Sequence, residues 1–131
     1  MASTENNGIS ESDKEAAEKF KGEANECFRQ EKFSAAENLY SKAIELNPNN
    51  AVYFANRSIT HLKQESFGYA LADASKAIEI DSTYTKAYYR YTNSKAKLYL
   101  QLIVGLFLIY FYKYFMKFFQ TCCCSYGIGE I

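Results

Sequence analysis

The chain has 131 residues, with 15 acidic and 15 basic side chains, so its net charge is zero. A chain of this length holds one small domain, and its charge balance excludes the dense basic face that nucleic-acid binding needs. The cysteines are Cys27 and the adjacent Cys122, Cys123 and Cys124, a spacing that fits neither a disulfide framework nor a zinc site. We therefore expect a cytoplasmic chain without a metal or other cofactor.

The N-terminal residues 1–13 are polar and acidic. They lack the basic start and the apolar core of a signal peptide, and we expect them to be disordered. Ser12-Asp-Lys-Glu15 fits a capping box, in which a serine and a glutamate three residues later satisfy the first amides of a helix. This motif predicts that the first helix begins near Asp13.

A repeat of 34 residues organises the segment that follows. SKAIEL at Ser41–Leu46 recurs as SKAIEI at Ser75–Ile80, 34 positions later, and Phe33 and Ala36 recur in the same register as Phe67 and Ala70. Because one register holds across the whole period, we assign repeats to residues 17–50 and 51–84, with a third beginning at Thr85.

Each repeat has the apolar spacing of two helices. Ser34-Ala-Ala-Glu37 fits a capping box at the start of one helix, and Asn47-Pro48 ends it, because proline cannot continue a helix. Asn50 can cap the next helix. Small residues, Ala24 with Ala36 and Ser58 with Ala70, would let paired helices approach closely. Residues 14–97 are therefore predicted to form an all-α antiparallel helix-turn-helix array of two repeats plus the first helix of a third.

The repeat pattern stops after Arg90. No residue of Leu98–Tyr112 is charged, and Val104 and Phe111 occupy positions where the repeat requires small residues. A helix that is apolar on every face is buried in a large core or in lipid. We predict a hydrophobic helix over 98–117, which through Met116 would span about 28 Å, close to the roughly 30 Å of a bilayer core.

Two explanations of this segment remain open. Flanking tyrosines and lysines are typical of a membrane interface, and Cys122, Cys123 and Cys124, in a Cys-rich tail over 118–131, are candidate lipidation sites. The segment would then be a C-terminal anchor on a cytosol-facing membrane. Its abrupt start and unusual composition are equally typical of a truncated or alternatively spliced product.

The array resembles the tetratricopeptide repeat family. The residues of the first repeat that match its large and small packing positions are Phe20, Ala24, Ala36, Tyr40, Ala43 and Pro48. Cys27 and Ser82 depart from the pattern, where the family usually has an aromatic residue and a proline.

Five polar residues are candidates for a binding groove. Lys21 and Asn25 share a helix face, as do Lys86 and Arg90, and Asn56 precedes Arg90 by one full repeat. Three cations and two amides in one groove suit a doubly charged anion, such as a peptide C-terminus ending in aspartate.

The five residues match the carboxylate clamp of chaperone-binding tetratricopeptide domains. That resemblance implies binding of the Glu-Glu-Val-Asp tails of heat-shock protein 90 and heat-shock protein 70. It also implies the roles: Lys21 and Lys86 hold carboxylates by charge, Asn25 and Asn56 bind the terminal carboxylate, and Arg90 contacts the peptide near its last residues.

Within that family, AIELNPNNAVYFANRS, FGYALADASKAIEID and TKAYYR are similar to the tetratricopeptide domains of phosphatase-5-like serine/threonine phosphatases. The catalytic domain of those enzymes needs several histidine ligands for two metals, whereas this chain has one histidine, His61, which we expect to be a packing residue. We therefore expect a non-enzymatic co-chaperone adaptor, tail-anchored or not. The alternative is a fragment of such a phosphatase that lacks its catalytic domain.

Overall fold

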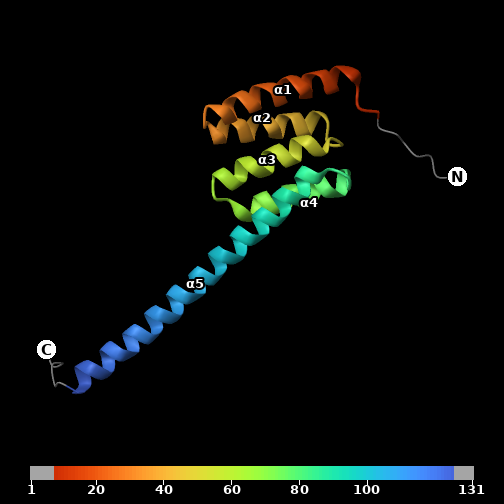
Figure 1. Ribbon diagram of the computed structural model, residues 1–131. Coiled ribbons are helices and arrows are strands. Elements are labelled where there is room, and N and C mark those ends of the chain that lie inside the picture. Colours follow the sequence, from red (N-terminus) through yellow and green to blue (C-terminus); the bar gives the residue numbers. More distant parts are fainter. Residues whose placement is uncertain (1–7, 126–131) are drawn as a thin grey trace. The chain divides into compact units, whose positions relative to one another are not determined.

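The computed structural model describes residues 8–125, with side chains from Gly8 to Thr121. These residues form five helices: α1 (Glu11–Arg29), α2 (Phe33–Leu46), α3 (Ala51–Lys63), α4 (Phe67–Ile80) and α5 (Thr85–Ser125) (Figure 1). The all-α prediction is confirmed. The chain divides into two compact units, residues 1–95 and 96–131, and each is described by itself.

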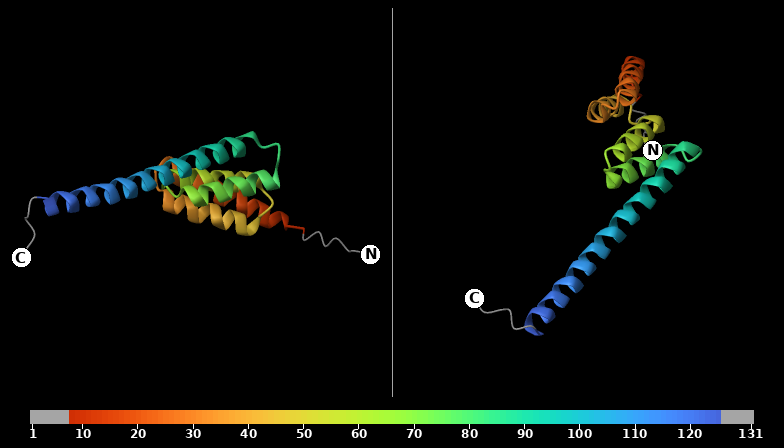
Figure 2. Two further views of the ribbon diagram at one scale, coloured as in Figure 1. Left: turned by 90° about the horizontal axis from the view of Figure 1, so that it is seen from below. Right: turned by 60° about the vertical axis from the view of Figure 1, so that its left-hand side comes forward.

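In the first unit, α1 pairs with α2 and α3 pairs with α4, and the four helices can be followed by their colours in the right-hand view of Figure 2. Small residues lie where the paired helices are closest. Ala24 and Ala36 are fully buried between α1 and α2. Between α3 and α4, the buried Ser58 hydroxyl donates to the Ala70 carbonyl at 2.7 Å. The predicted role of these small residues is confirmed.

The repeat extends to the backbone of the turns. Glu31 and Glu65, 34 residues apart, both adopt left-handed conformations, with φ of 58° and 59°. After each of them, an amide bonds back to a carbonyl of the preceding helix at 2.9 Å: Lys32 to Cys27, and Ser66 to His61. This closing pattern ends α1 and α3 in the same way.

One predicted helix cap is confirmed and two are wrong. The Asn50 side chain accepts from the Val52 amide at 3.0 Å, and so caps α3. By contrast, α2 begins at Phe33, before Ser34, because the left-handed turn delivers the chain directly into the helix. Likewise α1 begins at Glu11, so Ser12 lies in its first turn. Residues 1–7 of the segment predicted to be disordered lie outside the described residues.

Buried alanines and aromatic rings form the core of the first unit as three consecutive clusters. The last cluster includes Ala87, so the first turn of α5 packs on α3 and α4. Ser94, two turns further along α5, is also fully buried. The clusters are Ala24, Ala36 and Tyr40; Ala17, Ala43 and Tyr53; and Ala51, Phe54, Ala55, Ala77 and Ala87.

The second unit contains the rest of α5, which continues without the turn that a complete third repeat requires. Its large apolar side chains between Leu100 and Phe119 are about half exposed or more, on every side of the helix. Among the described residues, this is the one helix whose length and composition would allow it to cross a membrane. Figure 1 draws it in cyan and blue.

Candidate functional site

A chain of hydrogen bonds joins four helices of the first unit. The Tyr40 hydroxyl on α2 donates to Asn25 Oδ1 on α1 at 2.6 Å. Asn56 Nδ2 on α3 donates to the same oxygen at 3.4 Å. Arg90 Nη1 on α5 donates to Asn56 Oδ1 at 3.3 Å. Three of the five candidate residues, Asn25, Asn56 and Arg90, therefore lie together.

Helix geometry brings these three residues to one place. Asn56 and Arg90 are one repeat apart and follow the same helical register, so stacking of the repeats aligns them. Asn25 lies one turn before the end of α1, within hydrogen-bonding reach of Tyr40, whose ring is buried with Ala24 of α1 and Ala36 of α2.

Arg90 is a partly buried cation without a counter-charge in the described part of the chain. Its guanidinium donates to the Ala55 carbonyl and to Asn56, and forms no ion pair within residues 8–121. Removal from water disfavours the charged form, so burial lowers the pKa of Arg90. In Arg57, by contrast, two hydrogen bonds of 2.8 Å to the Asp73 carboxylate raise the pKa.

The two candidate lysines lie one turn before Asn25 and Arg90 on the same helices. Lys21 is partly buried and pairs with Glu18, whose other oxygen accepts from the Tyr53 hydroxyl at 2.6 Å. These contacts lower the pKa of Glu18, with the Lys21 hydrogen bond as the largest cause. Lys86 is exposed and makes no hydrogen bond or ion pair in the described part of the chain. The structure records no contact from either lysine to the three linked residues.

The unused polar groups of this cluster are donors. Asn25 Oδ1 already accepts two hydrogen bonds. The N–H groups of the same amide, by contrast, have no acceptor among residues 8–121. Arg90 and Lys86 likewise have N–H groups to spare, and neither side chain contains an acceptor. A cluster of unused donors with net positive charge suits a carboxylate ligand.

Two residues that bond to the candidate residues were not predicted: Tyr40, which donates to Asn25, and Glu18, which pairs with Lys21. Tyr40 was identified only as a packing residue, and its ring is indeed 2% exposed. A phenylalanine would fill the same space, so the presence of tyrosine at this position was the one indication in the sequence of a polar role. Glu18 was not considered, although its spacing of three residues from Lys21 is typical of an ion pair on a helix.

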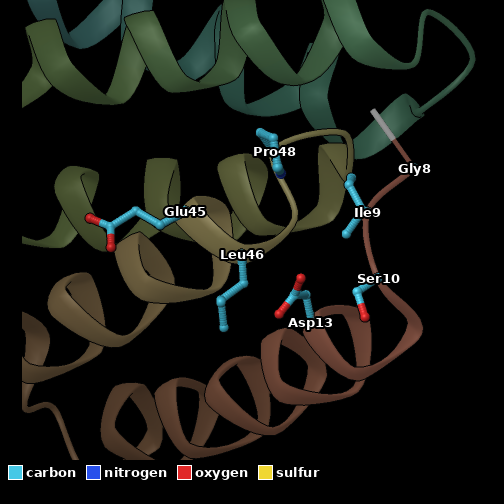
Figure 3. Close-up of a pocket in the computed structure, with 7 residues that line it drawn as sticks. All are labelled: Gly8, Ile9, Ser10, Asp13, Glu45, Leu46 and Pro48. Carbon is cyan, nitrogen blue, oxygen red and sulfur yellow. The ribbon is translucent and has the colours of Figure 1, made fainter. Parts of the chain in front are cut away.

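Other hollows of the first unit suit an anionic ligand less well. The crevice in Figure 3 carries the carboxylates of Asp13 and Glu45, which would repel an anion. A second hollow lies beside Arg57, but Asp73 neutralises that cation, and His61 is buried next to it as predicted. The crevice of Figure 3 is lined by Gly8, Ile9, Ser10, Asp13, Glu45, Leu46 and Pro48.

Comparison with known proteins places this fold. No family model matches the chain. The solved tetratricopeptide domain of OM64 from Arabidopsis is 35% identical, with a TM-score of 0.65, over 66% of this chain and 71% of that one. The chain belongs to the tetratricopeptide repeat family. The second tetratricopeptide domain of Spaghetti (RPAP3), solved with the heat-shock protein 90 peptide SRMEEVD, is 30% identical over 66% of this chain and 81% of that one, with a TM-score of 0.65.

Among curated proteins, this tetratricopeptide chain is similar to serine/threonine-protein phosphatase 5 of Homo sapiens, with 51% identity over 74 residues. The match covers 56% of this chain but 15% of the phosphatase, and no catalytic domain is evident in the 131 residues. The E3 ubiquitin-protein ligase CHIP of Arabidopsis thaliana is 38% identical over 73 residues, 56% of this chain and 26% of the ligase.

Proposed function

We propose that the first unit binds the free C-terminus of an acidic peptide, and that its partners are the Glu-Glu-Val-Asp tails of heat-shock protein 90 and heat-shock protein 70. The observation that carries this proposal is Arg90, a partly buried cation that has no counter-charge among the residues the structure describes and is hydrogen-bonded to Asn56. A carboxylate from the ligand would supply the missing negative charge.

Each candidate residue has a role that its surroundings support. The unused N–H groups of Asn25 and the second N–H of Asn56 donate to the terminal carboxylate. Arg90 offers its remaining N–H groups to the end of the peptide. Lys86 and Lys21 add charge, and Lys21 must exchange its contact with Glu18 for one with the ligand.

The comparisons support this class of ligand. Spaghetti (RPAP3) was solved with a heat-shock protein 90 peptide. The TPR2B domain of yeast Sti1, solved as a pHsp70 complex, is 31% identical with a TM-score of 0.62. The heat-shock protein 90 peptide of the Spaghetti complex, SRMEEVD, is short and has three acidic residues among its last four.

Calorimetric titration of the full chain in detergent micelles with SRMEEVD tests the proposal. We expect micromolar affinity, about −7 to −8 kcal/mol, weakening as salt screens the charges. Arg90→Ala or Lys86→Ala should cost about 1.5–3 kcal/mol. Lys95→Ala is the matched control. Lys95 follows Lys86 by nine residues, about two and a half helical turns, and therefore lies on the opposite face of α5. Equal affinity for the C-terminally amidated peptide would exclude a carboxylate site.

We further propose that the second unit anchors the chain to a cytosol-facing membrane. The supporting observation is that no residue of its most apolar stretch is buried, which would be unfavourable in water. The lipidation proposed for Cys122, Cys123 and Cys124 concerns side chains outside the described residues. The rival origin, a spliced or truncated phosphatase-5-like product, predicts an exon boundary near Arg90 in the transcript.

A further inference from the structure

The hydroxyl of Tyr40 lies outside the five candidate residues but touches one of them. Tyr40 belongs to α2, whereas the candidates lie on α1, α3 and α5. Its ring packs between Ala24 and Ala36 with 2% of its surface exposed, and its hydroxyl reaches Asn25 Oδ1 at 2.6 Å. Because the ring is held on all sides, the hydroxyl is a fixed point beside the Asn25 amide.

An asparagine amide can present either its oxygen or its N–H₂ group to a ligand, and its neighbours decide which. Here the orientation of both amides is determined by Arg90, whose guanidinium can only donate hydrogen bonds. Arg90 therefore requires the oxygen of Asn56. The N–H₂ group of Asn56 then faces Asn25 and requires that residue's oxygen in turn.

Tyr40 lies at the other end of this series of hydrogen bonds, which runs from Arg90 through Asn56 to Asn25. The Asn25 oxygen that faces Asn56 also faces the phenol, so the Tyr40 hydroxyl is the donor. Burial raises the pKa of the Tyr40 phenol, which keeps this donor protonated at physiological pH. With its oxygen held from two sides, Asn25 keeps its N–H₂ group free.

We propose that Tyr40 is a positioning residue that holds the donor side of Asn25 toward the ligand, and so lets the site distinguish a terminal carboxylate from a neutral amide. This inference rests on the proposed function. Without the hydroxyl, only the longer contact of 3.4 Å from Asn56 still holds the Asn25 oxygen. The Asn25 amide can then turn over more readily and present its oxygen, which repels a carboxylate but accepts a hydrogen bond from an amide. Tyr40 thus acts through Asn25 and does not touch the peptide.

Tyr40→Phe tests the inference because it keeps the ring and removes the hydroxyl. We expect the affinity of the full chain for SRMEEVD to fall about 5- to 10-fold, and the affinity for the amidated peptide to change little. The ratio of the two affinities should therefore shrink, which a general loss of stability would not cause. Ser41→Ala is the matched control: its hydroxyl, next to Tyr40, accepts from Arg57 at 2.9 Å, away from the cluster. It should leave the ratio unchanged.

A double variant separates positioning from direct contact. If Tyr40 acts through Asn25, then Tyr40→Phe should cost nothing further in a chain that already carries Asn25→Ala. Independent, multiplying losses would overturn the inference, as would an unchanged affinity ratio in Tyr40→Phe. A wild-type chain that binds both peptides equally would overturn the proposed function itself, so the two failures are distinguishable. Thermal unfolding of each variant checks that the helices are intact.

Discussion

Two partly buried arginines of the array differ in what surrounds them. Arg57 bonds to Asp73 on α4 and to Ser41 on α2, so it ties three helices together. Arg90 has no carboxylate partner within residues 8–121. A partly buried cation without a counter-charge lowers the stability of the free protein and favours binding of an anion. Such local instability is common where a site is organised for a ligand.

This contrast predicts that two substitutions differ in how much they lower the free energy of unfolding. Asp73→Ala leaves the partly buried Arg57 without its carboxylate partner, and should lower the free energy of unfolding by about 3 kcal/mol. Arg90→Met removes the uncompensated charge and should change that free energy by no more than about 1 kcal/mol, while weakening peptide binding by about 1.5–3 kcal/mol. Chemical denaturation monitored by circular dichroism measures both. A large loss of stability in Arg90→Met would show that Arg90 is structural.

Tyr53 provides a prediction about alkaline pH. Its side chain is fully buried, and burial together with the hydrogen bond to Glu18 raises its pKa to about 12, from 10.0 for a free phenol. A raised folded-state pKa contributes stability that is complete below pH 10 and is lost as pH rises through about 12. The free energy of unfolding should therefore fall between pH 10 and about pH 12, and it should fall less in Tyr53→Phe, as measured by chemical denaturation at each pH. Tyr69→Phe, at an exposed tyrosine, should behave like wild type.

At the scale of elements, Glu31 and Glu65 each lower the stability of the turn that follows the first helix of a repeat, because both adopt a left-handed conformation. A side chain at positive φ costs about 1–2 kcal/mol, whereas glycine adopts this conformation freely. Glu31→Gly should therefore be more stable than Glu31→Ala by about 1 kcal/mol, and Glu65 should show the same difference. Thermal unfolding of the four variants checks this. Equal stability of the Gly and Ala variants would mean that the turn relaxes to another conformation.

The first turns of α5 should be the least stable part of the array. Ala87 and Ser94 are buried on one side, whereas Tyr88 and Tyr89 are 44% and 68% exposed. Because each repeat is stabilised by its neighbours, we expect hydrogen exchange at Lys86–Lys95 to open at lower free energy than at Leu39–Ile78. SRMEEVD should protect this segment by binding its ordered form. Uniform protection without peptide would contradict the prediction.

Sequence alone predicted helix ends better than helix starts. Asn47-Pro48 carries its own chemistry and ends α2 as expected, whereas among the predicted helix starts only Asn50, which caps α3, acts as expected. The two Ser-x-x-Glu motifs misled because the same letters are acceptable within the first turn of a helix. The left-handed turn that sets the start of α2 uses a glutamate, where glycine or asparagine would have been the signal.

The candidate site was predictable only in part, for a similar reason. The spacing of 34 residues between Asn56 and Arg90 is visible in the repeat, and these two side chains do meet. The orientation of an amide is not visible in a sequence, because it depends on hydrogen bonds between helices. Tyr40, which contributes the shortest of those bonds to Asn25, looked like any other core aromatic residue.

At the scale of the whole molecule, the chain joins two segments of opposite character. Residues 1–94 carry 11 basic and 14 acidic side chains, a net charge of −3, whereas residues 95–131 carry four and one, a net charge of +3. The first segment buries its apolar residues between helices, while the second exposes them around a single helix. Lysines at both ends of the apolar stretch, Lys97 and Lys113, are favourable next to anionic lipid headgroups.

Membrane insertion of the second unit can be tested independently of peptide binding by the first. If residues 98–116 span a bilayer, the full chain should stay with membranes during extraction with alkaline carbonate. A lysine near the centre of the span costs about 2.5–3.5 kcal/mol on insertion, so Leu106→Lys with Ile109→Lys should release the chain. Tyr99→Lys with Leu100→Lys is the matched control, because those lysines reach the headgroups from the end of the helix. If the wild-type chain is extracted, the segment is not an anchor, and peptide binding should be unaffected. If the central lysines leave the chain bound, its attachment depends on other residues.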